Sequence, residues 1–187
     1  MDISLILAQF MSGLSRGMML FLIASGLSLI FGVMNILNFA HATLWLAGAY
    51  FCYTFWYLMQ DSGLGLWVAM LLAALSMAVV GWIIEVLLIR RVYNRELPEQ
   101  LLLTYGLILV INDLIKLTWG VEDKMITRPK LVAKPVFILD MPFDSYFIFV
   151  ILIGLAVAVG LWLFLKKTRY GHIVRAAVFS REMVSAL

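Results

Sequence analysis

Long apolar runs separated by short polar segments make up most of the chain. The runs cover residues 13–34, 66–89, 100–119 and 145–165, and a further apolar segment covers 38–58. An α-helix rises 1.5 Å per residue, so about 20 apolar residues cross the ~30 Å hydrocarbon layer of a membrane. The pattern therefore predicts an all-α, polytopic transmembrane bundle with about five membrane segments.

Two segments fit this pattern less simply. Residues 3–11 are apolar but too short to cross, so we expect them to lie at the interface before the first span. The segment 38–58 begins with polar residues and ends in an aromatic cluster, which suits the headgroup level. It is either a full crossing or a broken, re-entrant helix, and these alternatives place the N-terminus on opposite sides of the membrane.

The connecting segments are predicted from turn residues and charge. Asp61-Ser62-Gly63 forms a turn, and residues 120–144 form a polar loop with three prolines. Residues 166–187 are predicted to form a basic amphipathic helix, which either lies on anionic lipid or docks into a cytoplasmic partner.

Basic residues predict the orientation of the spans. They follow the runs that end at Ile89 and Leu165, and they are Arg90, Arg91, Arg95, Lys166, Lys167, Arg169, Arg175 and Arg181. Short loops rich in Lys and Arg stay in the cytoplasm, so we expect both sets there and the loop 120–144 outside.

Composition excludes several classes of function. The chain is 64% hydrophobic and 13% charged, whereas soluble domains carry roughly 25% charged residues. A net charge of +3 gives no support for nucleic-acid binding, and one cysteine with two histidines supplies neither a disulfide framework nor a metal cluster. The sequence contains no catalytic triad and no phosphate-binding glycine loop. We therefore expect a transport component rather than an enzyme, with no cofactor in this chain.

The polar residues after the first span are the main candidates for a transport pathway. Asn35, Asn38 and His41 follow one another at intervals of three residues in an apolar setting. Lipid offers no hydrogen bonds, so these side chains must point into protein or a wet cavity. One interpretation is a role in substrate passage; the other is structural, with hydrogen bonds to neighbouring helices or with Asn38 as a helix N-cap.

Other charged residues in the spans have partners within reach. Asp113 and Lys116 are three residues apart, which predicts an ion pair near the outer interface rather than a proton relay. Glu85 lies one turn before Arg90 and Arg91 and is expected to pair with them or to extend to the interface.

Three segments together resemble a known family, the LivH-type permease subunits of branched-chain amino acid ABC importers. They are GLSLIFGVMNILNFAHATLWLAGAY (26–50), LLLTYGLILVINDLIKLTWG (101–120) and TRYGHIVRAAVFSREMVSAL (168–187). The run Asn-Phe-Ala-His after a Gly-Val pair is the most specific marker. Ala42 departs from the pattern, because relatives usually have Gly after this His.

The resemblance implies the partners and the place in the cell. A multi-pass permease of the bacterial inner membrane would pair with a homologous second permease, with cytoplasmic ATP-binding subunits that bind ATP and Mg, and with a periplasmic solute-binding protein. Membrane lipid surrounds it. Cargo would pass Asn35, Asn38, Phe39 and His41 by alternating access. Branched-chain amino acids are the usual cargo, and relatives take urea, short amides or aromatic acids.

The resemblance also implies a coupling function for the tail. Residues 166–187 would contact the ATP-binding subunit as a cytoplasmic coupling segment, through Tyr170, Gly171, Arg175, Ala176, Arg181 and Glu182. Glu182 matches the acidic position of the family's coupling signature, while Met183 and Val184 replace two alanines. Family members continue for about a hundred residues, so residues 1–187 are expected to be a truncated, N-terminal part of a transmembrane permease domain.

Two functions of other classes stay open at this stage. One is a stand-alone channel or ion-coupled carrier that uses His41 and Asp113, with a pH dependence in the range of histidine. The other is a membrane scaffold that transports nothing and binds a partner through its small-residue seams.

Overall fold

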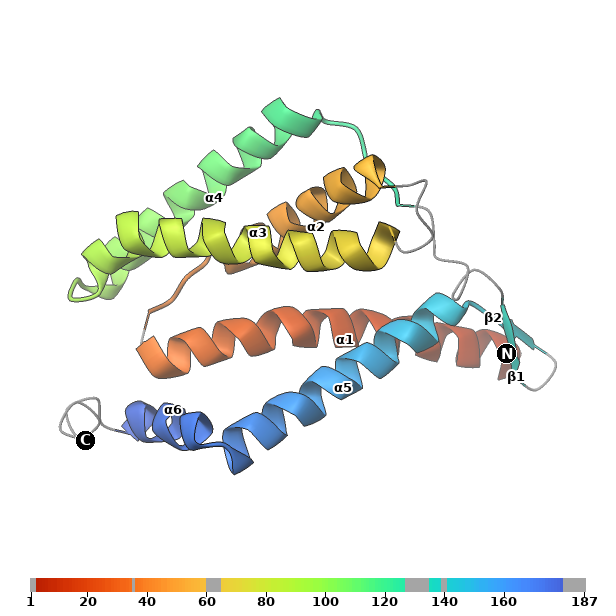
Figure 1. The fold of residues 1–187 in the computed structure, drawn as a ribbon. Helices are drawn as coiled ribbons and strands as arrows, with labels where there is room; N and C mark the ends of the chain where they lie inside the picture. Colours follow the sequence, from red (N-terminus) through yellow and green to blue (C-terminus); the bar gives the residue numbers. More distant parts are fainter. Residues whose placement is uncertain (1–2, 35, 60–64, 127–134, 139–140, 180–187) are drawn as a thin grey trace. The chain divides into compact units, whose positions relative to one another are not determined.

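The computed structural model describes residues 3–34, 36–59, 65–126, 135–138 and 141–179. Its helices are α1 (Ile3–Met34), α2 (His41–Leu58), α3 (Gly65–Leu87), the short 3-10 helix η1 (Ile89–Val92), α4 (Leu97–Trp119), α5 (Ser145–Lys167) and α6 (Arg169–Phe179). The strands β1 (Val136–Ile138) and β2 (Met141–Phe143) form an antiparallel hairpin. The helical prediction is confirmed, and the hairpin is a departure from the loop expected over 120–144 (Figure 1).

Among the described helices, four are long and apolar enough to cross a membrane. These segments are Leu5–Gly32, Gly65–Val92, Leu97–Trp119 and Ser145–Lys167. They confirm a multi-pass membrane protein. Helix α2 is outside this group, although the sequence predicted about five membrane segments, because its histidine, threonines and interfacial aromatics lower its hydropathy.

Helix α1 corrects the expected boundary of the first span. Residues 3–11 do not form a separate interfacial segment, because one helix of 32 residues runs without a break from Ile3 to Met34. At 1.5 Å per residue it is about 48 Å long, which exceeds the ~30 Å hydrocarbon layer. The first residues of the predicted span 13–34 therefore lie well inside the helix.

Side chains at the helix starts explain where α4 and α5 begin. Helix α4 starts at Leu97, three residues before the predicted boundary, with Pro98 in its first turn, where a missing N–H costs no hydrogen bond. Helix α5 starts after Asp144, whose carboxylate accepts a hydrogen bond from the Tyr146 N–H at 3.0 Å.

The described chain divides into two compact units. The first contains α1, the hairpin, α5 and α6, and the second, Ile36–Thr127, contains α2 to α4. In the first unit α1 packs along α5, and both helices run in the same direction (Figure 1). Their closest approach is at Gly154, where an added Cβ would lie 2.8 Å from the Cβ of Met18. The absence of a side chain at Gly154 is what lets the helices meet.

In the second unit, α2 packs against both α3 and α4. The core of this unit contains Ala40, Ala47, Leu107, Ile111 and Ile115. Ala69 and Ala73 of α3, a pair of small residues four positions apart, are also buried. The second pair, Ala74 and Ala78, is exposed.

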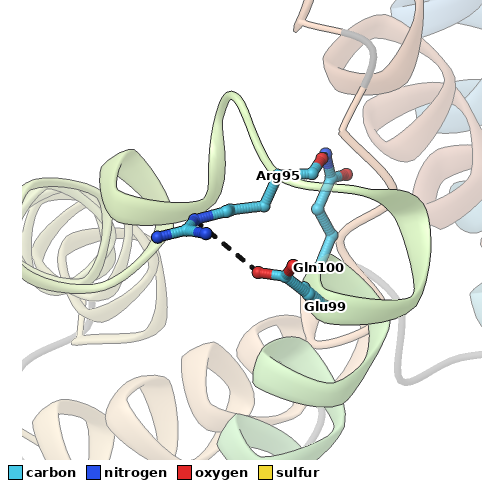
Figure 2. A network of polar contacts seen from close by, with 3 residues as sticks. All are labelled: Arg95, Glu99 and Gln100. Carbon is cyan, nitrogen blue, oxygen red and sulfur yellow. Dashed lines mark hydrogen bonds and ion pairs between the residues drawn. The ribbon is translucent and has the colours of Figure 1, made fainter.

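Polar contacts hold the turn between η1 and α4. The Gln100 side-chain amide donates to the Arg95 carbonyl at 3.1 Å, and the Arg95 guanidinium lies 3.6 Å from the Glu99 carboxylate (Figure 2). Gln100 is 5% exposed, and its backbone carbonyl accepts a hydrogen bond from the Thr104 hydroxyl at 3.0 Å. These bonds fix the polar turn that the charge pattern places on the cytoplasmic side.

Candidate transport site and coupling helix

The chain leaves helical geometry between α1 and α2, at the residues predicted to line a pathway. Asn38 is 5% exposed, and its side-chain oxygen accepts a hydrogen bond from the Ala40 N–H at 3.0 Å. Its backbone carbonyl accepts from the His41 N–H at 3.2 Å. This is the Asx-turn arrangement, in which a side chain replaces a backbone partner. The N-cap of α2 is Ala40, so the placement of Asn38 at the N-cap was wrong.

The other pathway candidates lie around this turn. Phe39 is 47% exposed, while Ile36 and Ala40 on either side are fully buried. His41 begins α2 and is half-buried. Asn35 lies outside the described residues. A role of Asn38, Phe39 and His41 in substrate passage stays a prediction.

A groove between α2 and α3 begins at His41. Its volume is about 490 Å³, and its lining is mostly small or apolar: His41, Leu44, Trp45, Gly48, Ala49, Cys52, Met70, Ala73, Ala74, Met77 and Gly81. An added Cβ at Gly48 would lie 3.3 Å from the Met77 side chain, so the glycine widens the groove. In the sequence, only the spacing of small residues indicates that a groove can form here.

A tryptophan joins α4 to α2 in the second unit. The Trp119 indole N–H donates to the Thr54 hydroxyl at 2.7 Å, and that hydroxyl in turn donates to the Tyr50 carbonyl at 3.0 Å. The indole ring also contacts Tyr50 and Phe51, with ring centroids 5.4 and 5.8 Å apart. The sequence analysis did not find this contact, because the partners of Trp119 lie far away along the chain.

Removing the Thr54 hydroxyl should weaken this contact between α4 and α2. We expect Thr54→Val to lower the free energy of unfolding by about 0.6–1.7 kcal/mol, the range for a hydrogen bond between membrane helices. Thr118→Val is the matched control, because the Thr118 hydroxyl bonds only to the Leu114 carbonyl of its own helix. The free energy of unfolding of both purified variants is measured in mixed micelles. Equal losses of this free energy in the two variants would show that the hydrogen bond from Trp119 to Thr54 does not stabilise the protein.

Of the charged residues discussed in the spans, some form the expected ion pair and one does not. Asp113 and Lys116 form the expected ion pair at 3.5 Å, with side chains 72% and 60% exposed. Within the described residues Glu85 forms no ion pair with Arg90 or Arg91. Pairing of Asp113 with a neighbouring cation favours a structural role over proton transfer.

A sharp elbow separates α5 from α6. The Thr168 hydroxyl donates to the Phe164 carbonyl at 2.7 Å and accepts from the Gly171 N–H at 2.9 Å, so Thr168 ends one helix and caps the next. A Cβ added at Gly171 would overlap the Phe164 carbonyl oxygen and lie 2.6 Å from the Leu165 carbonyl oxygen. Only glycine fits this position.

Helix α6 confirms part of the tail helix predicted over 166–187, over Arg169–Phe179. Arg175 and Ala176 are exposed and Gly171 is buried. Tyr170 lies in the first turn of the helix, whereas Arg181 and Glu182 lie outside the described residues. Contact of these residues with an ATP-binding subunit stays a prediction.

Comparison with known proteins identifies the family. Residues 9–187 match the family described as the permease component of the branched-chain amino acid transport system. The chain belongs to this family. The match covers both the α1–α2 break and the α5–α6 elbow, so these features lie within the permease domain.

Individual relatives of the permease are distant. The high-affinity branched-chain amino acid transport system permease protein BraD of Pseudomonas aeruginosa is 27% identical over an alignment of 193 positions, gaps included, that covers 97% of this chain and 62% of BraD. LivH of Salmonella typhimurium is 26% identical over an alignment of 129 positions that covers 63% of this chain and 40% of LivH. LivH of Escherichia coli is 26% identical over an alignment of 122 positions with the same coverage of each chain. The chain thus spans less than two thirds of these relatives. No solved structure matches it.

Sequence reasoning missed one charged residue of the permease, Arg16. The span predicted over 13–34 begins three residues before Arg16, whereas α1 begins at Ile3, so Arg16 lies well inside a membrane-spanning helix. Arg16 is exposed and forms no ion pair within the described residues. An ionisable side chain inside a span is costly and usually marks a functional position. The mostly apolar residues 3–11, directly before the predicted span, were the signal that pointed to it.

Proposed function

We propose that this chain is the membrane-spanning permease part of an ATP-driven importer for branched-chain or related amino acids. The observation that carries the proposal is the family match over residues 9–187. Separate cytoplasmic subunits bind ATP with Mg and hydrolyse it, a homologous second permease completes the pathway, and a periplasmic binding protein delivers the solute. The chain itself resides in the bacterial inner membrane.

Transport in this proposal proceeds by alternating access. Closure of the ATP-binding subunits moves α6, which is joined to α5 through the rigid elbow at Thr168 and Gly171. The helix break at Asn38 gives the cargo pathway a non-helical segment, where backbone groups are satisfied by protein and not by lipid. ATP binding can shift the conformational equilibrium only because the partners bind one state of the permease more tightly than the other.

The parallel direction of α1 and α5 supports one of the two topologies. If both helices run from outside to inside, the chain must cross the membrane an odd number of times between them. Helices α3 and α4 supply two crossings, so α2 must supply the third. The basic ends of α3 and α5 then face the cytoplasm, and the N-terminus lies outside.

Cysteine labelling tests this topology. In a Cys52→Ala background, we expect Asp2→Cys and Asp123→Cys to react with an impermeant maleimide in intact cells, and Asn94→Cys to react only after permeabilisation. Protection of Asp2→Cys together with reaction of Asp123→Cys would show that α2 does not cross fully, and would exclude the outside N-terminus.

Reconstitution tests the function. The permease is expressed together with a homologous second permease, ATP-binding subunits and a periplasmic binding protein, and uptake of radioactive leucine, isoleucine and valine is measured in vesicles. We expect uptake that needs ATP and the binding protein, and a loss of more than tenfold when residues 168–187 are removed. Loss of ATP-binding subunits from the purified complex should accompany this deletion. Uptake without ATP would contradict the importer and favour a channel or carrier.

A further inference from the structure

The contact between α1 and α5 fixes the depth of Arg16. Helix α5 has 23 residues, from Ser145 directly after Asp144 to the basic residues of its last turn, Lys166 and Lys167, so it is about 34 Å long and matches the hydrocarbon layer closely. Gly154 is nine residues from its start, about 14 Å along the axis. This position is close to the middle of the membrane.

Arg16 shares that depth. Met18 packs directly on Gly154, and Arg16 precedes Met18 by two residues, about 3 Å along α1. The headgroups begin about 15 Å from the midplane of a ~30 Å hydrocarbon layer. The Arg16 backbone therefore lies far from both membrane surfaces, in the region where transporters hold their cargo.

The surroundings of Arg16 leave room for a ligand. Gly13 and Gly17 are on the same side of the helix as Arg16, and a Cβ at either glycine would meet no atom within 4 Å. Both glycines and Arg16 are exposed, whereas Ser15 is 1% exposed and Met18 is held against α5. Arg16 thus lies beside two residues without side chains, on the side of α1 opposite Met18 and its contact with α5.

We propose that Arg16 binds the carboxylate of the cargo near the middle of the membrane. The proposal rests on the proposed function, because an amino acid carries a carboxylate through the pathway. A guanidinium presents two parallel N–H groups to a carboxylate, and this pairing is strong where water is excluded. The cargo supplies the negative charge that no described residue of the chain supplies to Arg16.

A binding experiment tests Arg16 without transport. The probes are isovalerate, a branched carboxylate, and isovaleramide, its uncharged analogue, added to the purified permease at millimolar concentration. We expect isovalerate to raise the thermal unfolding temperature of the wild type by several degrees, Arg16→Lys to keep part of this shift, and Arg16→Met to lose it. Isovaleramide should leave the unfolding temperatures of the wild type and of both Arg16 variants unchanged. Arg90→Met, which removes an exposed charge in η1, should respond like the wild type.

Several outcomes would overturn the role of Arg16. They are the absence of an isovalerate shift in the wild type, an equal shift in Arg16→Met, and an equal response to isovaleramide. A further case is that the wild type and Arg16→Met differ in their isovalerate shift only in nanodiscs of phosphatidylglycerol and not in those of phosphatidylcholine. That result would mean that an anionic lipid, and not the cargo, pairs with Arg16. Loss of the second permease from Arg16→Met complexes would assign it to a protein acid.

Uptake separates this proposal from the proposed function. In the reconstituted importer we expect Arg16→Met to raise the KM for leucine at least tenfold with a smaller change in kcat. Leucine uptake by the wild type with an unchanged KM in Arg16→Met would overturn the role of Arg16 and leave the importer intact. The opposite result is also distinguishable. If isovalerate raises the unfolding temperature only when Arg16 is present, but the wild type imports no amino acid, the proposed importer function would be wrong and the carboxylate site at Arg16 would stand.

Discussion

Gly171→Ala is expected to reduce ATP-dependent uptake more than tenfold while leaving the amount of permease in the membrane unchanged. An alanine Cβ would overlap the carbonyl oxygens of Phe164 and Leu165, which are backbone atoms and cannot rotate away. Helix α6 must therefore move away from the end of α5. Alanine favours a helix by about 1 kcal/mol over glycine, so helix propensity predicts the opposite effect. Uptake in vesicles and co-purification of the ATP-binding subunits measure the result.

Gly160→Ala is the matched control for this variant. Gly160 is exposed on α5, and an added Cβ would meet no atom within 4 Å. We expect its uptake to equal that of the wild type. Wild-type uptake by Gly171→Ala would mean that the elbow tolerates a side chain and does not transmit movement to α5.

The second large effect is expected at the contact between α1 and α5. Gly154→Ala places a Cβ 2.8 Å from the Met18 Cβ and 2.9 Å from its sulfur, so the two helices must separate. Overpacking of this kind costs about 1–3 kcal/mol. We expect a corresponding fall in the thermal unfolding temperature of the purified permease, and a larger fall for Gly154→Val.

A double variant identifies the clash as the cause. Met18→Ala removes the sulfur and Cγ but keeps the Cβ, so Gly154→Ala combined with Met18→Ala should recover part of the loss. Gly160→Ala again serves as the control on the same helix. Simple addition of the two single losses would show that Gly154 and Met18 are not in contact.

Hydropathy predicted the spans well because burial in lipid depends on local composition. Helices α3 and α5 begin and end within about two residues of the predicted boundaries, since the charges at their ends mark the interface. Hydropathy gave the wrong start for α1. Residues 3–11 alone are too short to cross the membrane and were predicted to be a separate segment, whereas they continue into the first span as one helix. The hairpin at Val136–Ile138 was missed because three-residue strands leave little pattern.

The candidate site was less predictable because it depends on contacts between distant residues. Asn38 stood out as a polar residue in an apolar run, yet its bond to the Ala40 N–H follows from a break in the helix that the sequence left open. The requirement for glycine at Gly171 comes from backbone atoms of the preceding helix. The hydrogen bond from Trp119 to Thr54 joins residues 65 positions apart, which no local pattern encodes.

The pairing of α1 with α5 also sets the order of events during synthesis. Met18 and Gly154 are 136 residues apart, and ribosomes add about 5–20 residues per second, so α1 waits about 7–27 seconds for its partner. Helices α2 to α4 are contiguous in sequence and meet their neighbours as soon as they emerge. During that interval the Met18 side of α1 remains covered by lipid or by a chaperone of the insertion machinery.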